Sequence, residues 1–536
     1  MTLGLTGIDW IVFILTLGGS LIFGLILSIK IHAGKSSSNF FLAGRKLTWP
    51  IVGASLFATN IGAEHLVGLS GDSYRYGLCA GTVELTTFIT LGFASTFLFP
   101  FYLKNKVFTI PEFLELRYNE TARAFFSGLM LVICIMTKMA FTLFAGALVL
   151  NSLLGWNIMT VVMIMGIICA GITIIGGFAA VAFTDTIQTA IMLFGGILTL
   201  YIGLDKIGGW DALVSAAPAA MHIAKPFDDP NYPFWGVIAG AVYGGIFYWG
   251  IDQVNVQRVL GAPDLKQARW GAMLATFFKL SPVFIFALPG VIAYVLYPGL
   301  QGDETRQTFV LLLNKLLPDG IRGLVLASLL AALISSLDGV MNSVSTLVVR
   351  DFVLRFRPGT GEKTQVWIGR LSIVIATALG VGAAILVWKT PGGLYRYLQA
   401  ISIYFVMPIT PAIVFGILSK RVTLKGAIAS VLCGVLIASV YVADQLVGIT
   451  TAEKLFPFLH NKLTFNYTYR GLWGTLIITA VLFIVSSFTQ KTSYEKLAKT
   501  TYKWGGTPAP FKGLKDWRLQ LAVLSVITVF FYYWLW

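Results

Sequence analysis

The sequence predicts an all-α polytopic membrane protein with about fourteen transmembrane helices. Its composition is the first evidence for this class: of 536 residues, 57% are hydrophobic and only 12% are charged, and the mean hydropathy is +0.80. The second is that long apolar runs recur from one end of the chain to the other. Each run is close to the roughly 20 residues with which an α-helix crosses a bilayer.

The apolar runs follow one another with short loops, so we expect a single transmembrane domain over 1–536. The first run, 8–29, is expected to be a peripheral helix and not a cleaved signal, because no basic segment precedes it and its apolar stretch is too long. The expected spans are 8–29, 49–70, 78–103, 124–153, 158–176, 181–203, 235–257, 271–297, 321–349, 371–388, 394–417, 426–443, 471–488 and 519–535.

The basic residues predict how the chain crosses the membrane. Loops that follow odd-numbered spans hold more than twice as many Lys and Arg as loops that follow even-numbered spans. Basic loops stay in the cytoplasm, so we expect a multi-pass protein of the plasma (inner) membrane with both termini outside the cytoplasm. This pattern accounts for the net charge of +15 without a nucleic-acid partner. The basic loop 489–518 is expected to meet the anionic headgroups of membrane lipids.

The reactive side chains argue against an enzyme. The four cysteines all fall in apolar runs, and their spacing predicts neither a disulfide framework nor a zinc site. Of the four histidines only His65 lies in a predicted span, so no metal cluster or Ser–His pair is expected there. No loop is long enough for a soluble catalytic domain. The sequence therefore predicts a protein that is not an enzyme and holds no organic cofactor.

Polar side chains inside the predicted spans mark a functional site. The stretch ATNIGAEHLVGLSG, at 58–71, places Asn60, Glu64 and His65 within an apolar run. Such groups are costly in lipid and are functional by default. Glu64 has two open roles, as a ligand or as a partner of unwound backbone. The other ionisable residues within or at the ends of spans are Glu84, Lys138, Asp185, Asp252, Lys279 and Asp338.

The chemistry of this polar set favours a small polyhydroxylated solute over a lipid or a drug. A helix bundle can gather groups from separate spans around one cavity. Tyr248 and Trp249 provide aromatic faces that stack on the C–H faces of pyranose rings, and the Gln399 amide hydrogen-bonds hydroxyl groups.

Three of the predicted spans contain helix-breaking residues. The second carries Gly53 and Gly62, the seventh reads GGIFYWGIDQ, and the eleventh reads YFVMPITP. Such interruptions free backbone carbonyls and are tolerated where they line a cavity. Spans two and seven are five apart, which is the spacing of two inverted five-helix repeats that each open with a discontinuous helix. The repeats would be 49–203 and 235–417, followed by three peripheral helices in 426–535.

The ninth span, which contains AALISSLDGVMNSVST, places two hydroxyl groups side by side at Ser335 and Ser336. Most serines within a helix hydrogen-bond to their own backbone. A pair that faces a broken helix is different, because hydroxyls and freed carbonyls together form an all-oxygen site that suits Na⁺.

The chain resembles the sodium:solute symporter family, and within it the sodium/glucose cotransporters. The resemblance rests on stretches that run in family order through nearly the whole chain: FFLAGRKLTWPIVGASLFATNIGAEHLVGLSG, TIPEFLELRY, IIGGFAAVAFTDTIQ, FYWGIDQVNVQRVLGAPDLKQA, FKLSPVFIFALPGVIAYV, SSLDGVMNSVSTLVVRDF and LYRYLQAIS. It implies the inverted-repeat bundle of the sodium-coupled leucine transporters, with spans two to eleven as its core.

The resemblance also implies two ligand sets. The sodium site would use the carbonyls of Ala58, Ile61 and Ala332 and the hydroxyls of Ser335 and Ser336. The solute site would use Asn60, His65, Glu84, Thr87, Lys279 and Gln399, with Tyr248 capping the solute on its inner side and Trp249 beside it.

Two departures from the family pattern matter. Gly245 stands where a bacterial galactose transporter has a sugar-binding Asn, so one hydrogen bond is missing or replaced. Members that couple two sodium ions tend to have hydroxyl residues where this chain has Asp338 and Gly339, facing the counterpart of Asp185. Asp185 and Asp338 are therefore a candidate second cation or coupling site. Three roles stay open for Asp338: its carboxylate strengthens that cation site, it is protonated because two close buried carboxylates rarely both ionise, or it pairs with Lys138. The number of sodium ions per cycle also stays open.

The function predicted from these residues is sodium-coupled import of a neutral, hexose-like sugar by alternating access. One alternative is a sodium-coupled symporter of another solute, such as myo-inositol, sialic acid or an amino acid. A sensor or a channel on the same fold is the remaining alternative.

Overall fold

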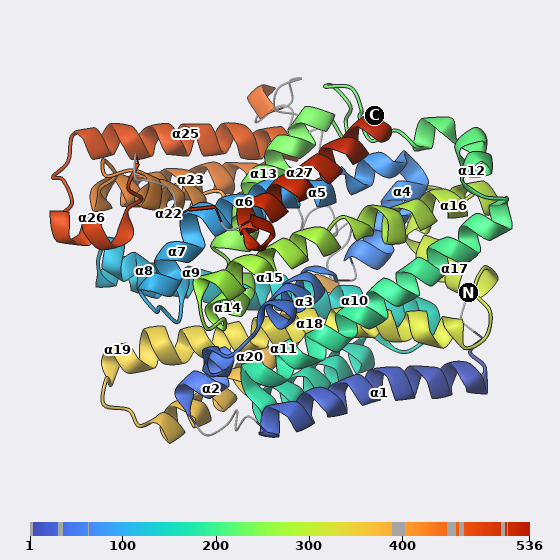
Figure 1. Ribbon diagram of the computed structural model, residues 1–536, viewed down its shortest axis with the longest axis horizontal. Helices are drawn as coiled ribbons and strands as arrows, with labels where there is room; N and C mark the ends of the chain where they lie inside the picture. Colours follow the sequence, from blue (N-terminus) through green and yellow to red (C-terminus); the bar gives the residue numbers. More distant parts are fainter. Residues whose placement is uncertain are drawn as a thin grey trace.

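The computed structural model describes residues 4–30, 36–62, 64–388, 403–446, 457–459, 466–504, 510–511 and 513–536. The described residues form helices of several kinds joined by short connections, and no strand occurs among them. Most of the long helices run along the long axis of the molecule (Figure 1). The predicted all-α class is confirmed.

Ten helices among the described residues are long and apolar enough to cross a membrane, and α13 (Phe234–Gly250) with α14 (Gln253–Leu260) makes an eleventh when this pair, bent by 50°, is taken as one span. The count of fourteen stays a prediction, because several expected spans are interrupted, merged or only partly described. The ten are Gly7–Lys30, Leu78–Lys104, Glu120–Leu154, Ile158–Ile207, Leu265–Leu296, Ile321–Phe356, Glu362–Leu386, Leu424–Asp444, Tyr467–Ser487 and Trp517–Trp534.

The longest of these, α11 (Ile158–Ile207), is two helices joined at Gly177, where the backbone has φ 56° and ψ −159°. A side chain at that position would be strained by the positive φ, and its Cβ would lie 2.7 Å from the carbonyl oxygen of Phe40. The predicted spans 158–176 and 181–203 lie on either side of this break.

The second expected span is a broken helix. It consists of α3 (Trp49–Asn60), an extended residue at Ile61 (φ −80°, ψ 116°), the π-helical segment η2 (Glu64–Leu69) and α4 (Ser70–Tyr76). In an unbroken helix the N–H of Gly62 would donate to the carbonyl of Ala58. Here it donates to Nδ1 of His65 at 3.3 Å. The interruption therefore redirects backbone groups and positions His65 at the same time.

The first half of this broken helix lies in the centre of the bundle, against α15 (Leu265–Phe278), α11 and α18 (Ile321–Leu347). Two glycines permit its close contact with α15. A Cβ at Gly53 would lie 2.7 Å from the Gly271 carbonyl oxygen, and a Cβ at Gly271 would lie 2.6 Å from Val52. Small residues of this kind let membrane helices approach backbone to backbone.

The N-terminal helix α1 (Gly7–Lys30) lies at the edge of the molecule and packs along α11 and α18. Its outer face carries exposed apolar residues such as Ile11 and Leu15, which are 59% and 70% exposed. Its buried Asp9 accepts hydrogen bonds from the first turn of α18, from Gly320 N at 2.7 Å and Gly323 N at 3.2 Å. This expected peripheral helix therefore caps the helix that carries Ser335 and Ser336.

Short helices in the predicted cytoplasmic loops gather toward one end of the long axis, at the left of Figure 1. They are α2 (Ser37–Leu42), α8 (Ile110–Arg117), α19 (Leu354–Phe356) and α26 (Tyr494–Thr500). The buried Arg117 links α8 to the end of α22 (Thr410–Leu418) and to the loop that follows it, because its guanidinium donates to the carbonyls of Gly416 at 2.7 Å and Val422 at 2.8 Å.

Candidate functional site

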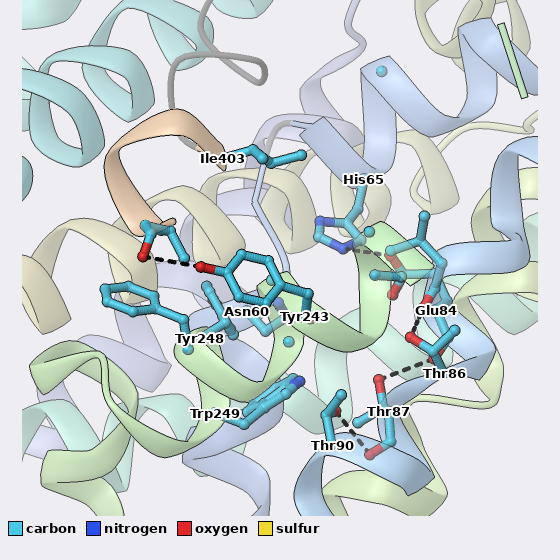
Figure 2. A pocket seen from close by; sticks show the side chains of 18 of the residues that line it. Asn60, His65, Glu84, Thr86, Thr87, Thr90, Tyr243, Tyr248, Trp249 and Ile403 are labelled. Carbon is cyan, nitrogen blue, oxygen red and sulfur yellow. Dashed lines mark hydrogen bonds and ion pairs between the residues drawn. The ribbon is translucent and has the colours of Figure 1, made fainter. Parts of the chain in front are cut away.

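A cavity of about 470 Å³ lies among the helices that the sequence analysis singled out (Figure 2). Its wall is formed by the broken helix, by the short helices between residues 78 and 93, by α10 (Ala140–Leu154), by α13 and by the C-terminal end of α15. Tyr467 and Thr468 of α25 (Tyr467–Ser487) also line it, so a helix expected to be peripheral contributes to the site. The predicted solute residues that line this cavity are Asn60, His65, Glu84, Thr87, Tyr248, Trp249 and Lys279.

Four of these residues form one polar cluster around the carboxylate of Glu84. The ammonium of Lys279, at the end of α15, donates to Oε2 of Glu84 and to Oδ1 of Asn60. Nε2 of His65 lies 3.3 Å from Oε1 of Glu84. Lys279 and His65 are only 3% and 7% exposed, so their charges and dipoles act in a medium of low polarity. The cluster offers hydrogen-bond donors and acceptors while its main charges cancel.

Three threonines continue the polar wall beside Glu84. Thr87 lies at the start of α6 (Thr87–Phe93), and its hydroxyl donates to the carbonyl of Glu84 at 2.9 Å. The hydroxyl of Thr90 donates to the carbonyl of Thr87 at 3.1 Å. Thr86, Thr87 and Thr90 all line the cavity, and each hydroxyl oxygen keeps the capacity to accept a hydrogen bond.

Thr90 occupies the space beside Gly245. A Cβ at Gly245 would lie 2.7 Å from Cγ2 of Thr90, closer than real side-chain contacts allow. The side chain that is absent from α13 at this point is therefore matched by one from α6. Gly245 stands out in the sequence and Thr90 does not, although Thr87 and Thr90 share one face of a helix at a spacing of three residues.

An aromatic pair forms another part of the wall. The rings of Tyr248 and Trp249, near the end of α13, meet edge to face with their centres 5.0 Å apart. Trp249 is 3% exposed and Tyr248 is half-buried. Tyr243, on the same helix, also lines the cavity (Figure 2), and its hydroxyl donates to the carbonyl of Met407 at 2.8 Å. This surface can stack against the apolar face of a small ring.

Two of the five predicted sodium ligands, Ser336 and Ile61, come together between α18 and the end of α3. The hydroxyl of Ser336 donates to the carbonyls of Thr59 at 3.2 Å and Ile61 at 3.4 Å, on the broken turn of α3. Ala58 and Ala332 are fully buried on the same two helices. Hydroxyl and carbonyl oxygens are the donors that a hard cation prefers, so this set fits Na⁺. Ser335 is differently engaged, because its hydroxyl donates to Oδ1 of Asp185 at 2.6 Å.

Asp185 is the centre of a second, deeply buried cluster. Its other oxygen accepts from Ser55 at 2.5 Å and lies 3.4 Å from Nη2 of Arg258. Arg258 also lies over Gly339, where a Cβ would be 2.6 Å from Nη2. The cation opposite Asp185 is thus a side chain of the protein, which the sequence analysis did not identify.

Asp338 is buried on α18, three residues after Ser335, and its carboxyl accepts from Thr173 at 3.2 Å. Lys138 does not pair with Asp338: its ammonium forms an ion pair with Asp252. Gln399 and the side chain of Glu64 lie outside the described residues.

Other kinds of site find no support in the part of the chain described. No group of three or more His, Cys, Asp or Glu side chains that could hold a metal occurs there. All four cysteines are free thiols, and Cys79, Cys134 and Cys169 are buried.

Comparison with known proteins identifies the family. The family model for the sodium:solute symporter family matches residues 40–434. The chain is 32% identical over 508 residues to the sodium/glucose cotransporter 4 of Danio rerio, covering 87% of this chain and 77% of the relative. It is 29% identical over 517 residues to the sodium/myo-inositol cotransporter of Homo sapiens, covering 87% and 71%.

A solved structure supports the same fold. The substrate-bound, outward-open structure of a Na⁺-coupled sialic acid symporter superimposes with a TM-score of 0.75, at 20% identity, over 91% of this chain and 99% of that one. Because the family and its relatives are sodium-coupled transporters, an enzymatic function is excluded. The chain belongs to the sodium:solute symporter family and is an integral, multi-pass membrane protein that couples the transport of a solute to sodium.

Proposed function

We propose that this symporter imports a neutral, hexose-like sugar together with Na⁺ by alternating access. The observation that carries the proposal is the charge-compensated cluster of Asn60, His65, Glu84 and Lys279 on the wall of the cavity. Carboxylate, amide, imidazole and ammonium groups hydrogen-bond hydroxyls from several directions, and the nearby ring of Tyr248 can stack on a pyranose face.

The charge balance of the cavity favours a neutral solute. Lys279 is paired with Glu84, and Lys138 is paired with Asp252. An anionic solute would have to displace one of these carboxylates, which costs several kcal/mol when it leaves a buried charge uncompensated. The same reasoning disfavours sialic acid, which is an anion, relative to a sugar or a polyol.

Sodium coupling follows from the shared broken helix. We propose that Na⁺ binds to the carbonyls of Ala58, Ile61 and Ala332 and to the hydroxyls of Ser335 and Ser336. Asn60 lies between two of these residues in the chain, and His65 receives the Gly62 N–H in the same interruption. An ion that fixes this turn also fixes two solute ligands, so each ligand raises the affinity for the other.

The remaining candidate ligands take their places in this scheme. Thr87 and Gln399 complete the solute set, and Tyr248 caps the solute on the inner side with Trp249 beside it. Asp185 acts in coupling, because its carboxylate links Ser335 to Arg258. Asp338 lies next to that link. Both termini lie outside the cytoplasm, with the basic loops inside.

Myo-inositol is the second candidate solute. A relative that covers most of this chain carries that specificity in its name. A cyclic polyol presents the same neutral hydroxyl groups to the polar cluster, whereas it lacks the ring oxygen of a pyranose.

A panel of radiolabelled solutes in proteoliposomes tests the proposal. The panel contains glucose, galactose, myo-inositol, sialic acid and one neutral amino acid, each with an inward gradient of Na⁺ or of choline. We expect saturable uptake of a hexose that requires Na⁺. Uptake of myo-inositol alone would replace the hexose with the polyol, and sodium-driven uptake of sialic acid alone would overturn the neutral-solute proposal.

A further inference from the structure

Lys138 and Asp252 form an ion pair that joins two irregular helices at the cavity. Lys138 lies in the π-helical segment η5 (Ile133–Met139), and its side chain lines the cavity with 24% exposure. Asp252 is 1% exposed and lies in the break between α13 and α14, where the chain bends by 50°. Single π-helical turns within α-helices are frequent at functional sites.

The pair reaches Tyr248 by two routes. The ammonium of Lys138 lies 5.5 Å from the centre of the Tyr248 ring, within the range of a cation–π contact. Nδ2 of Asn255 donates to Oδ2 of Asp252 and to the carbonyl of Tyr248, each at 3.0 Å. The ring and the backbone of Tyr248 are therefore both tied to the same ion pair.

Asp252 has a second, separable task. Its Oδ1 accepts from the backbone N–H of Val254 at 3.3 Å and so caps the N-terminus of α14. Asn caps helices about as well as Asp, whereas it cannot form an ion pair with Lys138. An Asp252→Asn substitution thus removes the charge and keeps the cap.

The burial of Asp252 makes the ion pair costly to separate. Separating the pair while Asp252 stays buried would leave an uncompensated carboxylate, which is strongly unfavourable. Separation of the pair costs less only in an arrangement in which water reaches the carboxylate. The pair therefore stabilises the arrangement in which Tyr248 lies against the cavity.

We propose that the Lys138–Asp252 pair is a latch that positions Tyr248 as the inner gate, so that it opens only when Na⁺ and solute are both bound. The proposal rests on the proposed role of Tyr248 in the solute site. Lys138 and Asp252 act as positioning residues, and their loss lets the inner gate open with Na⁺ alone.

The test measures two fluxes in proteoliposomes: radiolabelled Na⁺ entry without solute, and Na⁺-driven hexose uptake. We expect Asp252→Asn and Lys138→Met each to raise the solute-free Na⁺ leak about tenfold, the change that ~1.4 kcal/mol of lost stability in the closed arrangement produces. Hexose accumulated per Na⁺ should fall by a similar factor. Lys138→Arg, which keeps the charge, should retain most of the coupling.

Asp516→Asn is the matched control. Asp516 also caps a helix, α27 (Trp517–Trp534), and pairs with Arg518 at 2.6 Å, but neither residue lines the cavity. This variant should leak no more than the wild type. The charge-reversed double variant Lys138→Asp with Asp252→Lys should recover part of the coupling that either single reversal loses.

If Asp252→Asn and Lys138→Met leak Na⁺ no faster than the wild-type protein does, the latch proposal is wrong. A wild-type protein that takes up no hexose would instead contradict the proposed solute, while the Na⁺ leak still reports on the gate. A variant that loses thermal stability and both fluxes would assign the pair to folding and also overturn the proposal, because a latch leaves a folded but leaky protein.

Discussion

Glu84 is the residue on which the polar cluster depends. Its two oxygens separately engage Lys279 and His65, and it is followed by the threonines that extend the cavity wall. A buried carboxylate with two cationic or polar partners is held in one rotamer, so it presents a fixed edge to a solute. Such pre-organisation is what a small polar ligand requires, because few contacts must supply all of its affinity.

The contact between Thr90 and Gly245 yields a prediction about specificity. Gly245→Asn should lower Na⁺-driven hexose uptake about tenfold, because an overpacked buried side chain costs ~1–3 kcal/mol. Thr90→Ala combined with Gly245→Asn should recover much of that uptake, since the Asn then fills the space that Thr90 vacates. The measurement is the ratio of maximal uptake rate to KM for each hexose in proteoliposomes.

Gly244→Ala serves as the control for adding a side chain to this turn of α13. A Cβ at Gly244 meets no atom within 4 Å. Equal losses in Gly244→Ala and Gly245→Asn, with no recovery in the double variant, would show that Thr90 and Gly245 are not coupled.

Residues of the cluster were predictable from the sequence because charged groups in membrane helices are rare. Asn60, His65, Glu84 and Lys279 stood out because burying such polar groups in a lipid bilayer costs free energy. The structure brings these four residues together. Thr90 and Arg258 did not stand out, since a threonine is inexpensive in a membrane helix and Arg258 was assigned to a loop. The contacts of Thr90 and Arg258 depend on which sides of neighbouring helices pack together. A single sequence does not contain that information.

At the scale of elements, the interruptions of the helices carry the function. Cavity residues lie at the break after α3, in the π-helical turns η2 and η5, and before the bend between α13 and α14. In the sequence, Gly62 predicted the first break, which follows α3. The position of the second break depends on Asp252 as a helix cap, which became apparent only from the structure. The eleventh span, with Pro408 and Pro411, begins outside the described residues.

The broken helix leads to a prediction about sodium. Ser336→Ala should raise the Na⁺ concentration for half-maximal hexose uptake about tenfold, because removing one oxygen ligand costs ~1–2 kcal/mol, similar to a lost hydrogen bond. Ser328→Ala on the same helix is the control, since its hydroxyl donates only to the carbonyl of Val325 at 2.7 Å. An unchanged Na⁺ dependence in Ser336→Ala, with maximal uptake preserved, would remove Ser336 from the sodium site.

At the scale of the molecule, the arrangement of loops agrees with the charge pattern. Four short helices from four predicted cytoplasmic loops gather at one end of the long axis, whereas α4, α12 (Trp210–Ala216) and α17 (Thr308–Lys315) lie toward the other end (Figure 1). The all-α class and this alternation follow from composition and charge. The number of spans does not, because α11 appears as one helix with a break and the second span as several short helices.

The orientation can be tested with single cysteines at the two ends. Lys491 lies in the basic loop before α26, and Ser215 lies in α12; both are exposed. In intact cells a membrane-impermeant thiol reagent should label Ser215→Cys, and it should label Lys491→Cys only in inverted vesicles. The native thiols give a low background, since three are buried and Cys433, which is half-buried, can be replaced by Ser.

Labelling of Lys491→Cys in intact cells would reverse the proposed orientation. Labelling of both cysteine variants from the same side of the membrane would contradict the alternation of loops on which the predicted span count depends.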